Sequence, residues 1–509
     1  MIMKKIYSII ASAIIAVGFT ACTQSDFVET SAPDVSATSI DNAIQFGTYM
    51  GKGGSTRAGA TGAITSHGTG THQLGETGYE FGVFAVYGSS TAYNSLTSRV
   101  PNFMYNEKVY WDGTNNVFKY DNLKYWPNGK ASSTDNNADD QNATSTTLNY
   151  LNFFAYAPYV DKSSALSDTY GIIEINGSST AIASETSGTG KNAVNNPVLK
   201  YKLDPENVVD LLWGTAGTNG VTVKDGAQNG GVVNTTTDGS SITTSAQNAG
   251  KNVNIDMTKM KTNGKVNFNF LHALGMLGGT DGTLTSGVKI QAVTDDASNI
   301  TGAETKITVV DLTIQLASVK DRSDVSHTGY ATEGYFDLAR GTWYNQTYSG
   351  SADTHIYYAP GSASYAGATA AQKVLNTDIA EPASFTWIDG TPAGVITASK
   401  KNVFAADVPA LYLIPDTKPT YNVTITYIVR TKDSKLAAGW SEVTQSITKT
   451  IEFGDFIKLN KCYNLLIKLG LTSVKFEATV SDWSTDINDD SNDSNDEQVV
   501  DLPINVTGA

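Results

Sequence analysis

The stretch YNVTITYIVR, residues Tyr421–Arg430, decides the fold. Every odd-numbered position in it is apolar or aromatic, and Asn422, Thr424 and Thr426 alternate with them. Successive side chains of a β-strand point to opposite faces of the sheet, so this alternation predicts a strand with one face toward a core. The β-branched and aromatic residues that fill the apolar positions favour a strand as well.

Similar runs surround this stretch and are separated by clusters of Gly, Asn, Asp and Ser. In the second half of the chain they are Ala410–Ile414, Val443–Phe453, Cys462–Leu469 and Val474–Val480. Short strands at even spacing with turn signals between them are typical of a β-sandwich. Ile307–Leu316 and Gly334–Leu338 are expected to begin this second set of strands.

The first half of the chain contains a second group of strand patterns. They are Ala43–Met50, Tyr79–Tyr87, Lys108–Tyr120, Leu148–Tyr159 and Lys265–Leu274. In the second of these, Phe81 and Val83 share one face, and Phe84 and Val86 make the other face apolar too, which predicts burial on both sides. His272 continues an inward face, where a hydrogen-bonded structural histidine is favoured over a ligand.

Length and composition limit the class of protein. A chain of 509 residues is too long for one sandwich, so two domains are expected. The net charge of −15 and the lack of a basic cluster argue against nucleic acid as a partner. The only cysteines are Cys22 and Cys462. If Cys22 is acylated there is no disulfide scaffold, and Cys462 is expected to be a buried, inert thiol.

The beginning of the chain has the build of a bacterial secretory signal. Lys4 and Lys5 precede Ile6–Phe19, an uncharged run of 14 residues that is too short for an ordinary membrane-spanning helix. The small residue Ala21 is followed at once by Cys22, as in a lipobox, where the cysteine becomes the mature N-terminus and carries a diacylglycerol. Two acyl chains are enough for stable anchoring. The alternative is an ordinary signal peptide with an accidental cysteine.

Two segments between the expected strands are rich in one kind of residue, small residues in the first and acidic residues in the second. Gly51–Gly75 is a loop of small residues that contains Arg57, and such a loop is open to a protease; the alternative is a solvated linker arginine. Near the C-terminus, Thr485–Glu497 is acidic and solvated.

A sharp strand pattern follows the acidic run. Its apolar positions are Val500, Leu502, Ile504 and Val506. Two readings stay open: a final edge strand, which Pro503 suits, or a strand donated to another molecule.

No motif for catalysis or for a cofactor stands out. The five histidines, His67, His72, His272, His327 and His355, have no zinc-site spacing. The sequence contains no phosphate-binding GxxxxGK[ST] and no GxSxG elbow. Carboxylates are many, but nothing singles out a glycosidase pair. We therefore expect no enzyme, no cofactor and no metal site.

Taken together, several short segments resemble the fimbrillins, the subunits of type V pili of Bacteroides-like bacteria in the Mfa-like and major fimbrillin group. Beside the lipobox Cys22, the matching segments are Phe46…Thr56-Arg57-Ala58, Phe81–Phe84, Lys124–Pro127, Phe153–Tyr159, Asp210–Gly214, Phe270–Leu274 and Val480–Trp483. They run in order over most of the chain.

The resemblance implies two tandem transthyretin-like (Greek-key) β-sandwich domains after a lipoprotein signal peptide. It further implies that a trypsin-like protease cuts between Arg57 and Ala58, that the strand Ala43–Met50 leaves, and that a strand of the next subunit fills the groove. Val499–Val506 is then the candidate donor. Removing a strand leaves unpaired backbone groups and an apolar slot, and head-to-tail filling of such slots produces an open filament.

The expected organisation is a signal peptide at 1–21, a tether at 22–42, sandwiches at 43–300 and 301–484, and an acidic linker with the candidate donor strand at 485–509. The expected function is a structural subunit of surface fimbriae that mediates adhesion. The chain would first be lipid-anchored in the outer membrane and then lie in the fimbrium, with other fimbrial subunits and a host or bacterial surface ligand as partners. Alternatives are a tip or anchor accessory subunit, or a surface glycan-binding lipoprotein that uses Trp387 and Trp440.

Overall fold

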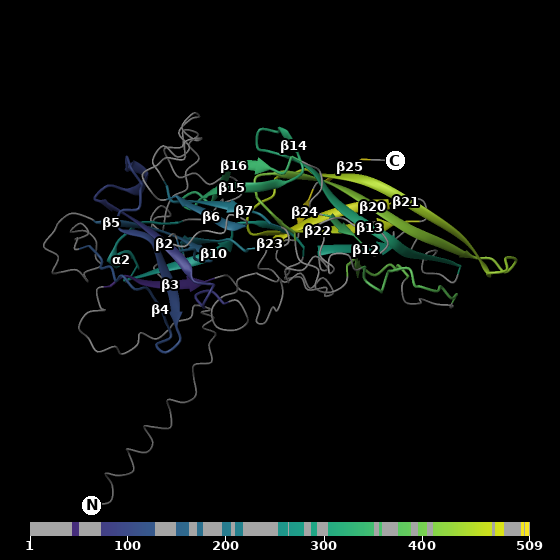
Figure 1. Cartoon of the computed structure of the whole chain (residues 1–509), viewed down its shortest axis with the longest axis horizontal. Coiled ribbons are helices and arrows are strands. Elements are labelled where there is room, and N and C mark those ends of the chain that lie inside the picture. Colours follow the sequence, from purple (N-terminus) through teal and green to yellow (C-terminus); the bar gives the residue numbers. More distant parts are fainter. Residues whose placement is uncertain are drawn as a thin grey trace, which may run out of the picture.

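The protein is almost entirely β-structure in the computed structural model (Figure 1). The structure describes residues 43–49, 73–127, 149–161, 170–176, 196–204, 209–216, 253–262, 264–278, 287–292, 304–350, 356–358, 375–387, 395–404, 411–470, 474–482, 500–502 and 504–507. Within them, the helical elements include η1 (Tyr93–Ser95) and α2 (Lys259–Thr262), both of a single turn. The all-β fold class predicted from alternation is confirmed.

Two sheets are built mainly from the first half of the chain. Sheet I has eight strands in the described residues, and its order is β1 (Gln45–Tyr49), β10 (Lys265–His272), β8 (Leu212–Ala216), β5 (Tyr150–Ala157), β2 (Phe81–Ser89), β3 (Met104–Asp112) and β4 (Val117–Lys119), with β9 (Asn254–Met257) beside β5. Sheet II has the order β16 (Thr342–Tyr348), β15 (Ala331–Asp337), β7 (Val198–Lys202) and β6 (Gly171–Asn176).

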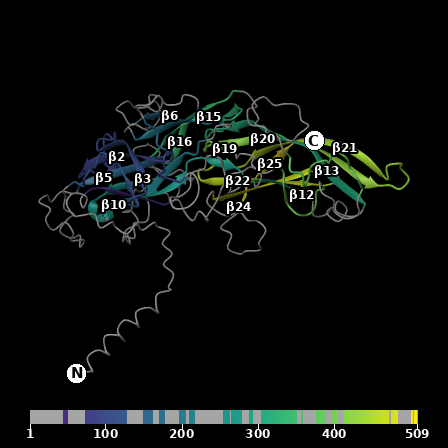
Figure 2. The same ribbon diagram turned by 60° about the horizontal axis from the view of Figure 1, so that its bottom comes forward.

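Two further sheets form the other end of the elongated molecule (Figures 1 and 2). Sheet III contains β18 (Lys401–Asn402), β12 (Val288–Ala292), β22 (Lys461–Leu469), β11 (Gly275–Leu277) and β19 (Leu411–Leu413), with β23 (Val474–Asp482) beside β22 and β24 (Val500–Leu502) beside β23. Sheet IV contains β14 (Ser326–Thr328), β13 (Thr305–Lys320), β20 (Lys418–Lys432), β21 (Trp440–Phe453) and β25 (Ile504–Thr507), with β17 (Ile356–Tyr358) beside β13.

Sheet I is buried on both faces. On β2, Phe81 and Val83 belong to a core inside the curl of sheet I, whereas Phe84 and Val86 belong to a larger core on its other face. The larger core continues through sheets II, III and IV. The two-sided burial predicted from the sequence is therefore confirmed, and it explains why this strand is apolar at successive positions.

The sheets interlace the two halves of the chain. β15 and β16 follow residue 300 but join sheet II, because β15 pairs with β7 from Glu333↔Lys202 to Asp337↔Val198. β11 and β12 precede residue 300 but pair in parallel with β22. The expectation that Gly334–Leu338 begins the second set of strands is therefore wrong, whereas Ile307–Leu316 does lie in β13 of sheet IV.

Tryptophan side chains hold the crossing strands in place. Trp213 Nε1 donates a hydrogen bond to the carbonyl oxygen of Leu338 at 2.8 Å, and Trp343 Nε1 donates to that of Ala273 at 2.7 Å. Gly341, in the turn between β15 and β16, has φ +62°, and a Cβ there would lie 2.2 Å from the Trp213 ring. Only glycine allows this turn to approach the indole so closely. These long-range contacts, rather than local pattern, bring β15 and β16 to sheet II.

Candidate functional site

The first strand lies at the edge of sheet I and is the part of the described chain that bears most directly on strand exchange. β1 pairs in parallel with β10, from Gln45↔Lys265 to Tyr49↔Asn269. On its other side, the Ile44 amide donates to the carbonyl oxygen of Lys124 at 2.9 Å. β1 therefore fills the space between β10 and the segment that follows β4.

Phe46 anchors β1 in the inner core of sheet I. It is 3% exposed, and its neighbour on the same side, Ile44, is 1% exposed. Four aromatic rings, of which Tyr120 is the nearest with a centroid separation of 5.3 Å, surround the Phe46 ring. The others are Phe268 at 5.9 Å, Phe153 at 6.1 Å and Phe81 at 6.5 Å. An edge strand is thus fixed by a side chain that reaches deep into the core.

Tyr120 also holds the backbone of β1. Its hydroxyl donates a hydrogen bond to the carbonyl oxygen of Ile44 at 2.9 Å. Burial raises the pKa of Tyr120 to about 12, because the phenolate would lose its hydration in this core. The Tyr120 hydroxyl therefore stays a neutral donor to Ile44 further into the alkaline range than an exposed tyrosine would.

Removing β1 would open an apolar slot. Burying one Phe or Ile side chain contributes about 1.5–3 kcal/mol, so losing Ile44 and Phe46 exposes aromatic surface that favours refilling. The outer edge of β10 would also lose its backbone partners. A strand with apolar residues at alternate positions has the pattern to refill such a slot.

Several predicted site residues lie outside the described residues. Cys22, Arg57 and Ala58 belong to this group, so lipidation and cleavage stay predictions. The backbone of the candidate donor segment is described at 500–502 and 504–506, where it belongs to the two short strands β24 and β25. β24 pairs with β23 from Ala478↔Leu502 to Val480↔Val500, and β25 pairs with β21 from Thr450↔Thr507 to Phe453↔Ile504. The segment thus contacts both sheets III and IV at their edges.

The two residues expected to be structural are indeed buried. His272 is 9% exposed, and its Nδ1 lies 2.9 Å from Asp210 Oδ1. The His272 backbone amide donates to Asn460 Oδ1 at 3.2 Å. Cys462 is fully buried in β22. The contacts of His272 are those of a hydrogen-bonded core residue, as predicted.

Trp387 and Trp440, which the sequence places near loops, lie together in the fold. Their ring centroids are 6.1 Å apart and their planes differ by 27°. Phe385, which sequence reasoning missed, packs edge-on against both rings. The sequence offered one indication that Phe385 belongs with Trp387: the two are two residues apart, and alternate positions of an extended segment share a face.

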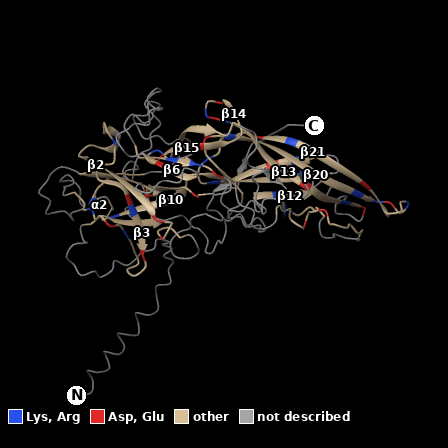
Figure 3. Ribbon diagram, viewed as in Figure 1, with Lys and Arg blue, Asp and Glu red and all other residues tan. Residues whose placement is uncertain are grey.

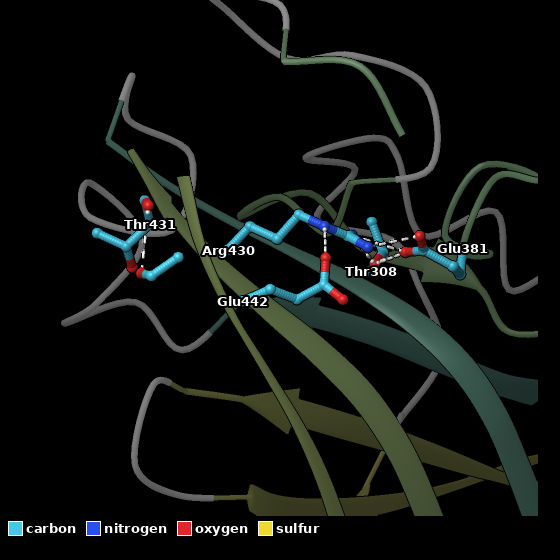
Figure 4. A network of polar contacts seen from close by, with 6 residues as sticks. Thr308, Glu381, Arg430, Thr431 and Glu442 are labelled. Atoms are coloured by element: carbon cyan, nitrogen blue, oxygen red, sulfur yellow. Dashed lines mark hydrogen bonds and ion pairs between the residues drawn. The ribbon is translucent and has the colours of Figure 1, made fainter. Parts of the chain in front are cut away.

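Beside these rings lies a polar network that nothing in the sequence pattern indicated (Figure 4). Arg430, whose side chain is 4% exposed, donates through both terminal nitrogens to Glu381, at 2.8 and 2.7 Å. Its Nε donates to Glu442 at 2.7 Å, and Thr308 also bonds to Glu381. Burial lowers the pKa of Arg430, but the hydrogen bonds to Glu381 and Glu442 outweigh it and the pKa is raised. The contacts between Glu381 and Arg430 of β20 therefore hold residues 381–387 against sheet IV.

Basic and acidic residues are interspersed along the ribbon (Figure 3). Among the described residues, no group of three His, Cys, Asp or Glu side chains is placed to hold a metal ion. Of the helices that the structure describes, none has the length and apolarity to cross a membrane.

Comparisons of the sequence found no match. No family model matches this chain, and neither does any curated protein.

Solved structures do show similarity. A crystal structure of a fimbrial protein from Bacteroides vulgatus is 18% identical, covers 87% of this chain and 99% of its own, and has a TM-score of 0.49. A protein from Bacteroides uniformis, proposed to act in cell adhesion, is 13% identical over 87% of this chain and 98% of its own, with a TM-score of 0.30. Another such protein, from Parabacteroides distasonis, is 9% identical over 92% of this chain and 97% of its own, with a TM-score of 0.28.

Proposed function

We propose that this chain is a structural subunit of a cell-surface fimbria and not an enzyme. It is exported as a lipoprotein anchored at Cys22, loses its first strand by cleavage between Arg57 and Ala58, and polymerises by strand exchange. Its partners are other subunits of the fimbria, and its location changes from the outer membrane to the surface fibre. Adhesion is the role of the assembled fibre. The proposal agrees with the fimbrial and adhesion roles in the names of the similar structures.

The observation that carries this proposal is the place of Phe46. A five-residue edge strand, paired with one neighbouring strand of its sheet, delivers an aromatic side chain into a socket of four rings. Such a strand can leave without dismantling the rest of sheet I. The socket it leaves is costly to expose, and this cost drives binding of a replacement strand.

The candidate replacement is the C-terminal segment of the next subunit. Val500, Leu502, Ile504 and Val506 have the alternation that such a slot requires. In one chain this segment makes three register pairs with β23 and four with β21. Pairings this short can be exchanged for a longer one with β10 of a neighbour.

The first experiment follows cleavage and assembly together. The full chain is treated with trypsin, the new N-terminus is sequenced, and polymers are resolved on a gel without boiling. We expect a chain that starts at Ala58 and a ladder of polymers. Trypsin also cuts after lysine, and Lys52 lies between the first strand and Arg57 in the sequence. The double variant Lys52→Gln/Arg57→Gln should therefore stay monomeric, whereas the matched control Lys52→Gln alone should assemble like the wild type.

Two further variants separate the steps. Deletion of residues 499–509 should permit cleavage but stop the ladder, because the donor is missing. An excess of a peptide with the sequence of residues 43–50 should also stop it, because the peptide refills the slot. Protein from the native cell surface that still starts at an acylated Cys22 and is only monomeric would rule out the shaft role and favour an anchor or tip subunit.

A further inference from the structure

Three large aromatic side chains meet at the end of sheet IV. The Phe385 ring lies 6.1 Å from that of Trp387 at 73°, and 5.4 Å from that of Trp440 at 72°. The two indoles are nearly parallel. Trp440 begins β21, directly after the turn that joins it to β20, and this turn lies at the far right end of the molecule in Figure 1. We call Phe385, Trp387 and Trp440 the tip aromatic cluster.

The tip aromatic cluster is not part of the folding core. None of its three members belongs to either of the two buried clusters of the described residues. Each of the three side chains is partly exposed. Aromatic rings that only cap a core would be continuous with it, so this position calls for another explanation.

Two cationic side chains contact rings of the cluster. The Arg430 guanidinium lies 4.1 Å from the centroid of the Phe385 ring, and Lys306 Nζ lies 5.5 Å from that of Trp387. Arg430 is itself fixed by Glu381 and Glu442 (Figure 4). The rings are thus positioned before any ligand arrives, which lowers the entropic cost of binding.

Hydrogen-bonding groups adjoin the rings on the same side of the strand. Trp440 and Glu442 are two residues apart on β21 and share a face, whereas the exposed Val443 points to the opposite face. The Glu442 side chain is 46% exposed, so it can accept further hydrogen bonds beside the one from Arg430.

The same face continues as a track of hydroxyl groups. Ser446 and Thr426 are hydrogen-bonded across the strands at 3.1 Å, and Thr448 and Thr424 at 2.9 Å. The exposed side chains of β21 next to the rings on this face, Glu442, Thr444, Ser446 and Thr448, are therefore polar.

We propose that the tip aromatic cluster is a binding site for neutral oligosaccharides. The C–H faces of a pyranose ring stack on indole, and its hydroxyl groups require acceptors and donors at the rim, which Glu442 and the hydroxyl track supply. The exposed carboxylate and the net charge of −15 disfavour acidic sugars. A flat protein partner would need a larger apolar area than three rings beside polar strands. The site is separate from the β1 slot, so it does not depend on strand exchange.

The test is a titration of the full, uncleaved chain with cellohexaose, maltohexaose and mannohexaose, followed by tryptophan fluorescence and calorimetry. At least one of the three should bind the wild type. Trp440→Ala and Trp387→Ala should each weaken that binding about tenfold or more, as truncation of a central aromatic contact does. Glu442→Gln, which keeps the shape of the side chain, should weaken it less.

The matched control is Trp111→Ala, because Trp111 is a partly exposed indole that packs against the Phe118 ring in the β3–β4 hairpin, away from the tip aromatic cluster. This variant should bind like the wild type. Circular dichroism and thermal melting identify variants that fail to fold. Absence of binding to all three sugars, or equal affinity in Trp440→Ala, would overturn the proposal. If the trypsin-treated wild type forms no polymer ladder but still binds a sugar, the result would contradict strand exchange and leave the sugar site standing.

Discussion

The rings of Phe46 and Phe268 lie 5.9 Å apart with 26° between their planes, although the two residues are not register partners. In the ladder, Phe46 pairs with Val266, and Phe268 pairs with Thr48. The Phe46 side chain therefore contacts a residue two positions further along β10. This diagonal contact joins the single aromatic residue of β1 whose side chain is described to the centre of the inner core, and it makes β1 dependent on Phe46.

We predict that Phe46→Ala loosens β1 selectively. Truncating a buried phenylalanine costs about 3–5 kcal/mol, and here the cost falls on the opening of one edge strand. The measurement is hydrogen exchange of the Ile44 and Gln45 amides, which donate to Lys124 and Gly264. Both amides should exchange much faster in the variant.

Gln45→Ala is the control for this change. Gln45 is exposed and lies on the opposite side of β1 from Phe46. The free energy of opening obtained from hydrogen exchange should therefore change by no more than about 0.5 kcal/mol. Equal protection in Phe46→Ala and the wild type would show that the ring socket does not hold β1.

Gly341 and Gly439 form a matched pair for testing the Trp213 contact. Both have positive φ, +62° and +82°, but a Cβ would strike the Trp213 ring only at Gly341 and meet nothing within 4 Å at Gly439. Gly439→Ala should cost about 1–2 kcal/mol of unfolding free energy from backbone strain. Gly341→Ala should cost about 1–3 kcal/mol more, because the turn must move off the indole. Urea unfolding followed by tryptophan fluorescence measures both; similar values would argue against close packing at this turn.

The carboxylates on Arg430 should differ in their contribution to stability. Glu381 is 20% exposed and binds Arg430 through both oxygens, whereas Glu442 is 46% exposed. Glu381→Gln should lower the unfolding free energy by about 2–3 kcal/mol, because it leaves a buried guanidinium under-paired. Glu442→Gln should change it by about 1 kcal/mol or less. Thermal melting of the two variants, and of Arg430→Lys, measures these contributions. A larger loss of stability from Glu442→Gln than from Glu381→Gln would contradict the view that Glu381 is the more important partner of Arg430.

Alkaline pH should destabilise the fold through Tyr120. Its pKa is raised by burial from near 10 to about 12, so between these values the unfolded chain has lost the proton that the folded chain keeps. Unfolding then releases a proton, and stability falls as pH rises, by up to about 2–3 kcal/mol from this group.

Melting temperatures of the wild type and of Tyr120→Phe between pH 8 and pH 12 measure the contribution of Tyr120 to this pH dependence. The variant should be less stable at pH 8, because it lacks the hydrogen bond to Ile44, and its stability should fall less steeply above pH 10. Parallel pH curves would mean that Tyr120 titrates normally in the folded protein. Burial raises the pKa of other tyrosines too, so a residual slope remains; they include Tyr93, Tyr156, Tyr201 and Tyr463.

Alternation in the sequence was enough to find several of the strands, but not β6, β7 or β9. It identified β20 from Tyr421–Arg430 and the two apolar faces of β2. Ile44 and Phe46 stand at alternate positions of the expected strand Ala43–Met50, and both are buried in the structure. These features are local, because the period of a strand and the polarity of its faces are written in consecutive residues.

Strand neighbours were decided only by the tertiary structure. The parallel partners of β1, β11 and β12, and the return of β15 to β7, join residues far apart in the chain. The same is true of the tip aromatic cluster and of Arg430 with Glu381, which come from separate segments. The sequence by itself determined an all-β chain with an apolar first strand. Which strand it lies against depended on packing between distant side chains, and these leave no periodic trace in the sequence.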